Sequence, residues 1–278
     1  MAKGYEKHNY VNAFWGFVHR FLVRYFGNPI ASETAIFELP FGLIIKWSTG
    51  TREEELHSMR YARSLGLPVP RGICYGSHRN KPGSILMTKV EGRILSDVWK
   101  QLNPSEQETI RSQMRSYLEI MRSARNPWGS RICSVTGSAI RSVRAPGGLI
   151  GPCKDEEKFH QGLIFHAFQH PMMDDAAYSR LIDTAKQIRT IPHDIVFTHG
   201  DLWHHNILVH NGRVSAILDW ESAGWYPEYW EITTVLRFRP EGWWWPEFVR
   251  SISPHPYEEE QESDGALIEL TGSSFEFL

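Results

Sequence analysis

The residues best suited to chemistry in this sequence are two acids and an amide. Asp201 precedes Asn206 by five positions, and a β-rich segment separates Asn206 from Asp219. Mg²⁺ prefers hard oxygen ligands and keeps several of its waters, so an Asn and an Asp held together suit it well. A separate Asp beside that pair could orient a hydroxyl group and accept its proton. This division of roles is typical of phosphoryl transfer, where catalysis is mostly positioning and charge neutralisation.

A β-hairpin is expected to position these side chains. Residues 206–209 and 214–218 are β-rich runs, and the Asn211-Gly212 pair between them favours a tight type I′ turn because both residues tolerate positive φ. Pairing the two runs brings their outer ends together, and with them the amide and the second acid. A further strand is expected over residues 195–197, just before the loop that holds the first acid.

The motifs around these residues resemble those of the aminoglycoside phosphotransferase and choline kinase superfamily, especially its fungal members. The matching segments are His199-Gly200-Asp201-Leu202 with Asn206, Ile217-Leu218-Asp219-Trp220-Glu221 and Ala223-Gly224. The resemblance implies that Asp201 is the catalytic base and that Asn206 and Asp219 hold Mg²⁺. It also implies that His199 braces the catalytic loop by hydrogen bonds and that ATP is the phosphoryl donor.

Departures from protein kinases point to a small-molecule acceptor. Gly200 stands where protein kinases carry the Arg that senses a phosphorylated activation loop, and Trp203 stands where Ser/Thr kinases carry a phosphate-contacting Lys. Trp220-Glu221 replaces Phe-Gly, and no Ala-Pro-Glu follows. We therefore expect an aminoglycoside, an amino alcohol or a related metabolite as the acceptor, with a cationic amine as one option.

One lysine closes an apolar run that is expected to be a strand over residues 42–47. A lysine at the end of a buried strand can carry its ammonium group to an anion. Within the resemblance, Lys46 contacts the α- and β-phosphates of ATP, and an acid on the following helix aims it. Comparison with family members favours Glu55 as that acid, while Glu53 and Glu54 stay open as alternatives.

A strand over residues 84–88 runs into a Gly-ended turn. Taken alone it would be a plain strand and turn, but its place after the lysine and the helix acid favours the hinge that joins two kinase lobes. In that hinge, the backbone of Thr88 and Val90 would pair with the adenine edge beneath Met87. No Gly-x-Gly-x-x-Gly motif precedes the lysine. The residues that would cover the phosphates of ATP therefore stay unassigned.

These assignments predict an α+β, bilobal, protein-kinase-like fold. Residues 1–88 are expected to form a small β-rich nucleotide-binding lobe, and residues 89–278 a larger, mostly helical lobe for catalysis and acceptor binding. An amphipathic pattern from Pro104 predicts a helix in the second lobe. Residues 126–159 are rich in Gly, Ser and Pro, and a loop of that length inside a domain usually carries function or disorder.

Composition suits a globular protein of this size. The chain has 278 residues, of which 41% are hydrophobic and 22% charged, and its net charge of −2 gives no sign of a nucleic-acid partner. Three widely spaced cysteines favour a reducing compartment, so we expect a cytoplasmic protein. No apolar run approaches the ~18 to 20 residues that span a bilayer, so no stable membrane insertion is expected.

The segment from Ala13 to Phe26 is aromatic, basic and free of acids. It is either a targeting or membrane-surface helix or a helix packed on the first lobe. It lacks a small-residue cleavage site and an uninterrupted apolar centre, which favours the packed helix.

Other interpretations stay open at this stage. Histidines 193, 199, 204, 205 and 210 would allow a zinc site, but His204 and His205 are adjacent and would point apart on an extended chain. The missing glycine motif would suit a catalytically weak or inactive nucleotide-binding protein, and a protein kinase is a third alternative. Tryptophans 203, 225, 230 and 243–245 are either core residues or walls of an acceptor pocket that binds ammonium groups. The acidic residues from Glu258 to Glu276 would favour cationic acceptors if they covered the cleft.

Overall fold

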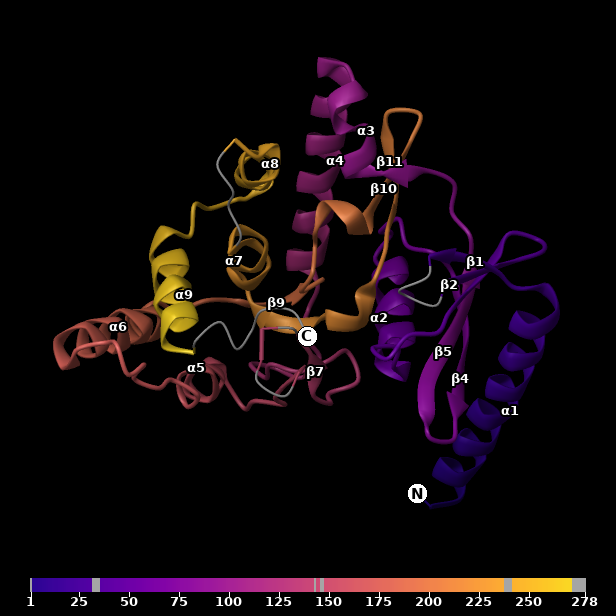
Figure 1. The fold of residues 1–278 in the computed structure, drawn as a ribbon, viewed down its shortest axis with the longest axis horizontal. Coiled ribbons are helices and arrows are strands. Elements are labelled where there is room, and N and C mark those ends of the chain that lie inside the picture. The colour runs from indigo at the N-terminus through magenta and orange to yellow at the C-terminus, as the bar shows by residue number, and fades with distance from the viewer. Residues whose placement is uncertain (1, 32–35, 143, 146–147, 238–241, 272–278) are drawn as a thin grey trace. The chain divides into compact units, whose positions relative to one another are not determined.

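The computed structural model describes residues 2–31, 36–142, 144–145, 148–237 and 242–271 (Figure 1). The chain forms two compact units: Met1–Lys100 with His205–Glu221, and Gln101–His204 with Ser222–Leu278. The first unit is discontinuous because it takes in a hairpin from later in the chain. The lobe boundary at residue 88 stays a prediction, since a compact unit need not coincide with a functional lobe. Glu276 lies outside the described residues.

Five antiparallel strands form the main sheet of the first unit, in the order β1-β2-β3-β5-β4 (Figure 1). β3 lies in the middle of this order and ends at Lys46, which pairs with Ile85 of β5. The expected strand with a terminal lysine is therefore present, with a neighbouring strand on each side. The bounds are β1 Asn28–Ala31, β2 Ile36–Leu39, β3 Leu43–Lys46, β4 Gly72–His78 and β5 Lys81–Thr88.

Two helices, α1 (Ala2–Phe26) and α2 (Glu53–Ser64), cover opposite faces of this sheet (Figure 1). Ile45 of β3 belongs to a core cluster against which Trp15, Leu22 and Val23 of α1 pack. The next residue, Lys46, points the other way because side chains alternate along a strand. Its ammonium group contacts α2.

Glycines bring α1 close to β4. A Cβ at Gly16 would overlap the carbonyl oxygen of Ser77, and a Cβ at Gly76 would lie 2.8 Å from Gly16. On the same side of α1, His19 is fully buried and its Nδ1 lies 2.6 Å from the Ser84 hydroxyl. Burial lowers the pKa of His19 to about 4, so the ring is neutral at physiological pH. One face of α1 is thus fitted to the sheet.

The first unit also contains a three-stranded sheet in the order β11-β10-β6. The φ angles of Asn211 and Gly212, between β10 and β11, are 50° and 68°. Both are the left-handed values that a type I′ turn requires, so the predicted hairpin is confirmed. The bounds are β6 Arg93–Ile94, α3 Leu95–Val98, β10 Ile207–His210 and β11 Arg213–Ile217.

The second unit is mostly helical. Its long helix α4 begins at Pro104, as the sequence predicts, and Asn103 and Glu106 form a reciprocal capping box at its start. Two short strand pairs, β7 with β8 and β9 with β12, complete this unit, and the α+β class is confirmed. The bounds are α4 Pro104–Ser123, β7 Ile140–Arg141, β8 Leu149–Ile150, α5 Glu156–Ile164, α6 Asp175–Gln187, β9 Ile195–Thr198, β12 Gly224–Pro227, α7 Trp230–Leu236, α8 Trp244–Ile252 and α9 Glu258–Leu270.

A buried arginine ties the Gly-rich segment before β8 to two helices of the second unit. The guanidinium carbon of Arg144 lies 3.5 Å from the centroid of the Trp230 ring. One of its nitrogens donates to the Thr234 hydroxyl of α7 at 2.6 Å, and another pairs with Asp264 of α9. A planar guanidinium can stack on a ring and bond at its edge at the same time. Arg144 therefore links α7 to α9 from within the core.

Candidate active site

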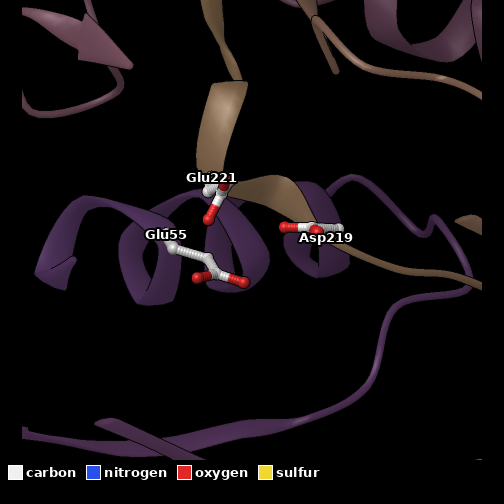
Figure 2. A group of neighbouring side chains, drawn as sticks. All are labelled: Glu55, Asp219 and Glu221. Carbon is white, nitrogen blue, oxygen red and sulfur yellow. The ribbon is translucent and has the colours of Figure 1, made fainter. Parts of the chain in front are cut away.

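A buried ammonium group and three carboxylates meet at the end of β3. The Nζ atom of Lys46 lies 3.0 Å from Glu55 Oε1, 2.5 Å from Asp219 Oδ1 and 3.4 Å from Glu221 Oε2. Glu55 projects from α2, and the other two acids come from the turn after β11 (Figure 2). All four residues belong to the first unit. We call Lys46, Glu55, Asp219 and Glu221 the lysine cluster.

The two acids that the sequence left open as alternative partners of Lys46 contact other groups. Glu53 accepts a hydrogen bond from Asn12 Nδ2 at 3.1 Å, and Glu54 lies 3.5 Å from the Arg52 guanidinium. Both stand in the first turn of α2, where the helix dipole favours acids. Glu55 is thus the acid of α2 that contacts the lysine.

The lysine cluster carries surplus negative charge. Burial alone would lower the pKa of Lys46, but the carboxylates of Glu55, Asp219 and Glu221 raise it above its ordinary value, so the lysine stays protonated. Burial raises the pKa of Glu55 to about 7 although Lys46 opposes the shift. One ammonium faces three carboxylates, and the excess charge favours a further cation or a proton.

The donor set fits a hard divalent cation. Carboxylate oxygens of Glu55, Asp219 and Glu221 all lie within 4.8 Å of one another (Figure 2). Mg²⁺ binds through one or two carboxylates and completes its shell with waters and phosphate oxygens. Lys46 balances one of the three charges, so the remaining charge matches that of Mg²⁺. The sequence did not assign a role to Glu221, although an acid two positions after Asp219 was a signal for one.

The predicted second metal ligand lies at the same end of the hairpin as Asp219. The amide of Leu218 donates to the carbonyl oxygen of Asn206 at 2.8 Å, and the next pair in the register is Ile207 with Ile217. Asn206 is buried. The amide and the acid thus occupy neighbouring positions, and their binding of Mg²⁺ stays a prediction.

Asp219 has an unusual backbone conformation. Its φ is 60°, in the left-handed region that non-glycine residues other than Asn, Asp and His seldom adopt. The next residue, Trp220, is fully buried and donates its indole N–H to the carbonyl of Ile217 at 2.9 Å, which pins the turn. The turn therefore holds position 219 in a backbone conformation that Asp tolerates better than most other non-glycine residues.

The loop that holds the predicted base belongs to the second unit. His199 is fully buried, and its Nδ1 accepts a hydrogen bond from the amide of Asp201 at 3.2 Å. This contact is of the kind that the resemblance implied for His199. Gly200 has a φ of 82°, and a Cβ there would collide with the carbonyl oxygen of Ser222. The loop therefore requires glycine at this position.

A buried acid of α7 holds the same loop through its backbone. The carboxylate of Glu231 accepts hydrogen bonds from the amides of His199 at 2.7 Å, Gly200 at 3.3 Å and Leu202 at 3.3 Å. Burial raises the pKa of Glu231 to about 7, although these three bonds favour the ionised form. The sequence analysis missed Glu231, and its only signal there was an acid inside the otherwise apolar start of a helix.

The predicted hinge is the end of β5. Met87 is buried, and the amide of Thr88 donates to the carbonyl of Arg71 at 3.1 Å. The amide of Lys89 donates to the carbonyl of Gly42 at 2.7 Å. An adenine contact by Thr88 would therefore use its carbonyl oxygen. The roles of Met87, Thr88 and Val90 in nucleotide binding stay predictions.

The six tryptophans that the sequence left open divide into two groups. Trp225, Trp230 and Trp245 are fully buried, so they are core residues. Trp203, Trp243 and Trp244 are half-buried, and the rings of Trp203 and Trp243 stack with centroids 5.9 Å apart at 23°. Trp203 follows Asp201 by two residues, so one ring of this stacked pair belongs to the loop of the predicted base.

Comparison with known proteins gives a consistent match. A family model described as "Phosphotransferase enzyme family" matches residues 33–259, whereas no curated protein matches the chain. Solved structures with a similar fold include a thermostable mutant of aminoglycoside phosphotransferase APH(4)-Ia in its apo form. That structure has a TM-score of 0.63 at 15% identity, with 90% of this chain and 88% of the other covered.

Two further matches contain ligands. The same enzyme as a thermostable mutant in ternary complex with ADP and hygromycin B gives a TM-score of 0.57 at 14% identity, covering 93% of this chain and 88% of the other. ADP-bound aminoglycoside phosphotransferase APH(2'')-Ib gives 0.59 at 12% identity, covering 93% and 96%. The kinase-like fold expected from the sequence is confirmed.

Proposed function

Because this chain belongs to the phosphotransferase enzyme family, we propose that it transfers the γ-phosphate of ATP to a hydroxyl group of a small molecule. The observation that carries this proposal is the contact of buried Lys46 with Glu55 and Asp219. Phosphoryl transfer needs a fixed cation for the nucleotide phosphates and carboxylates for Mg²⁺. Similar structures that contain ADP support a nucleotide as the donor.

In the donor half of the reaction, Lys46 binds the α- and β-phosphates and Glu55 fixes its direction. Met87, Thr88 and Val90 hold the adenine at the end of β5. Asn206 and Asp219 would hold Mg²⁺, and Glu221 would offer a further oxygen donor. When bound, this ion neutralises charge on the transferring phosphoryl group.

In the acceptor half, Asp201 orients the attacking hydroxyl and takes its proton. The hydroxyl oxygen forms the new bond to phosphorus, the bond between the γ-phosphorus and the bridging oxygen breaks, and ADP leaves. His199 and Glu231 hold the loop of Asp201, through its amide and through neighbouring amides. Positioning of this kind supplies much of the rate enhancement in such reactions.

The acceptor is proposed to be a small hydroxyl compound with a cationic amine, such as an aminoglycoside or an amino alcohol. The complex of a similar protein with hygromycin B supports this class. The stacked Trp203 and Trp243 rings support it as well, because aromatic faces attract ammonium groups. Asp201 adds negative charge two residues before Trp203.

The proposal is tested by Mg²⁺-dependent ATP consumption with a panel of aminoglycosides and amino alcohols. The expected result is acceptor-dependent ADP release that is lost in Asp201→Asn. Asp183→Asn, which changes an exposed acid of α6, serves as the matched control and should retain turnover. A protein that binds ATP but shows no Asp201-dependent turnover with any acceptor would be the inactive nucleotide-binding alternative.

A further inference from the structure

Five aromatic side chains form an exposed stripe along α1. Tyr10, Phe14, Phe17, Phe21 and Tyr25 recur at intervals of three and four residues, which places them on one side of the helix. Between 48% and 76% of each residue is exposed. We call these five residues the aromatic stripe. A contiguous group of exposed aromatic side chains marks an interaction site in a folded protein.

The fold itself does not account for the aromatic stripe. α1 uses its opposite side for the sheet, where Gly16 meets β4 and His19 is fully buried. The rings of Phe21 and Tyr25 lie 4.8 Å apart and pack on each other at the surface of the helix. Phe14 lies edge-to-face on Trp15, which packs on the core of the sheet, so this one ring also supports the packing of α1. Packing on the sheet does not explain the exposure of about half or more of each stripe residue.

The sequence of α1 contains one acid, Glu6, and the part of the chain that contains the aromatic stripe has none. Residues 7–31 contain one Lys and two Arg but neither Asp nor Glu. Arg20 and Arg24 are exposed and follow the edge of the stripe at helical spacing, and the Arg24 guanidinium lies 5.8 Å from the centroid of the Tyr25 ring. Arg20 also lies 3.0 Å from His78 Nδ1. Aromatic rings beside cations, without acids, complement a surface of apolar chains and negative headgroups.

We propose that α1 docks the protein on the surface of a bilayer that contains anionic lipid. The helix lies in the plane of the interface, with the aromatic stripe among the headgroups and the upper acyl chains. Arg24 lies at the level of the lipid phosphates, and the negative charge of anionic lipids attracts its guanidinium group. Docking from one side of the helix leaves its sheet-facing side in place. Among the described residues, no helix has the length and apolar character needed to cross a membrane.

The test is flotation of the full chain with vesicles of phosphatidylcholine alone and with 30% phosphatidylserine, at low and high salt. Binding is expected with phosphatidylserine and should weaken as salt rises. The triple variant Tyr10→Gln, Phe17→Gln, Phe21→Gln should lower the partition coefficient on the order of tenfold for each lost ring. Arg24→Gln should lower binding to the anionic vesicles about fivefold.

The matched control is Phe165→Gln, which removes an exposed ring that lies after α5 in the other unit. It should bind vesicles as the native protein does. The triple variant should keep its unfolding midpoint and its ATP turnover, since the stripe belongs to neither the core nor the lysine cluster. Vesicle binding can therefore succeed or fail independently of the proposed reaction.

Three outcomes would overturn the proposal. One is the absence of binding to either vesicle, and a second is equal binding by the native protein and the triple variant. The third is concentration-dependent self-association that the triple variant abolishes, because the stripe would then pair copies of this chain.

Discussion

Replacing Glu55 with Gln is predicted to stabilise the protein while it impairs catalysis. Glu55 is buried, and one ammonium group serves three carboxylates in the lysine cluster. Gln has the shape of a protonated Glu, so the substitution removes the charge with little change in packing. Burial is the largest effect that disfavours the ionised Glu55 carboxylate, and Lys46 keeps Asp219 and Glu221 as partners in the variant, so a neutral side chain should stabilise the folded state.

The magnitude follows from the pKa of Glu55, which burial raises from 4.5 to about 7. Between these values the folded protein binds more protons than the unfolded chain, so Glu55 lowers stability as pH rises through this window. Above pH 7 the ionised Glu55 carboxylate lowers the free energy of unfolding by about 3 kcal/mol. Glu55→Gln does not titrate, so the variant should match the native protein near pH 4.5 and exceed it by up to about 3 kcal/mol at pH 8.

The assay is thermal unfolding of both proteins from pH 4.5 to 8 without nucleotide, together with turnover at pH 7.5. The midpoint of Glu55→Gln should rise above that of the native protein by several degrees as pH increases. Turnover should fall on the order of 10- to 100-fold, because the lysine loses the acid that directs it. Glu38→Gln is the matched control, since Glu38 pairs with Lys89 at 2.6 Å on the surface, and surface pairs contribute about 0 to 1 kcal/mol. A Glu55→Gln variant that is less stable than the native protein at pH 8 would refute the conclusion that burial of the ionised Glu55 carboxylate lowers stability.

Four further substitutions test the proposed roles and the buried arginine of the second unit. Asp201→Asn should lower turnover by orders of magnitude while ATP binding is largely kept. Asp219→Ala should weaken Mg²⁺-dependent ATP binding, measured by calorimetry. Equal effects of the two substitutions on ATP binding would contradict the roles assigned to these residues. Glu231→Gln should lower kcat on the order of tenfold or more with little change in ATP affinity, because an amide cannot accept all three N–H groups that the carboxylate accepts; an unchanged kcat would show that the loop is held by other contacts. Arg144→Lys should lower stability by about 2 to 4 kcal/mol in denaturant unfolding, since lysine cannot pair with Asp264 and stack on Trp230 together; a loss below about 1 kcal/mol would contradict this.

Local signals in the sequence were sufficient to predict the hairpin and the strand that ends at Lys46. Asn211-Gly212 specifies its turn by the backbone conformations that these two residues tolerate, and the structure has those conformations. Likewise, the apolar run before Lys46 required a buried strand, and the helix from Pro104 began at its cap. In each case a few neighbouring residues contain the physical cause, so a single sequence is sufficient.

Contacts between residues far apart in the sequence could not be predicted in this way. Glu231 follows Leu202 by 29 positions, and nothing local to Glu231 indicates that its carboxylate bonds the loop amides. The discontinuous first unit has the same origin, because only the folded chain shows that residues 205–221 join the first hundred. The extent of α1 was also underestimated, since it begins at Ala2 and the sequence pattern indicated a start near Ala13. The early turns are polar, and apolar periodicity gives no signal there.

Glu55 and Glu231 are buried acids of the candidate site, and comparison with family members favoured the first while nothing indicated the second. Each is nearly inaccessible to solvent, and burial raises the pKa of each to about 7. A core built for stability alone would use apolar residues at both positions, because an ionised carboxylate loses hydration there. The chain instead keeps one acid against the lysine and the other against three loop amides. Sequence rules based on stability fail at such positions, since their residues are retained for the geometry that they impose on neighbouring groups.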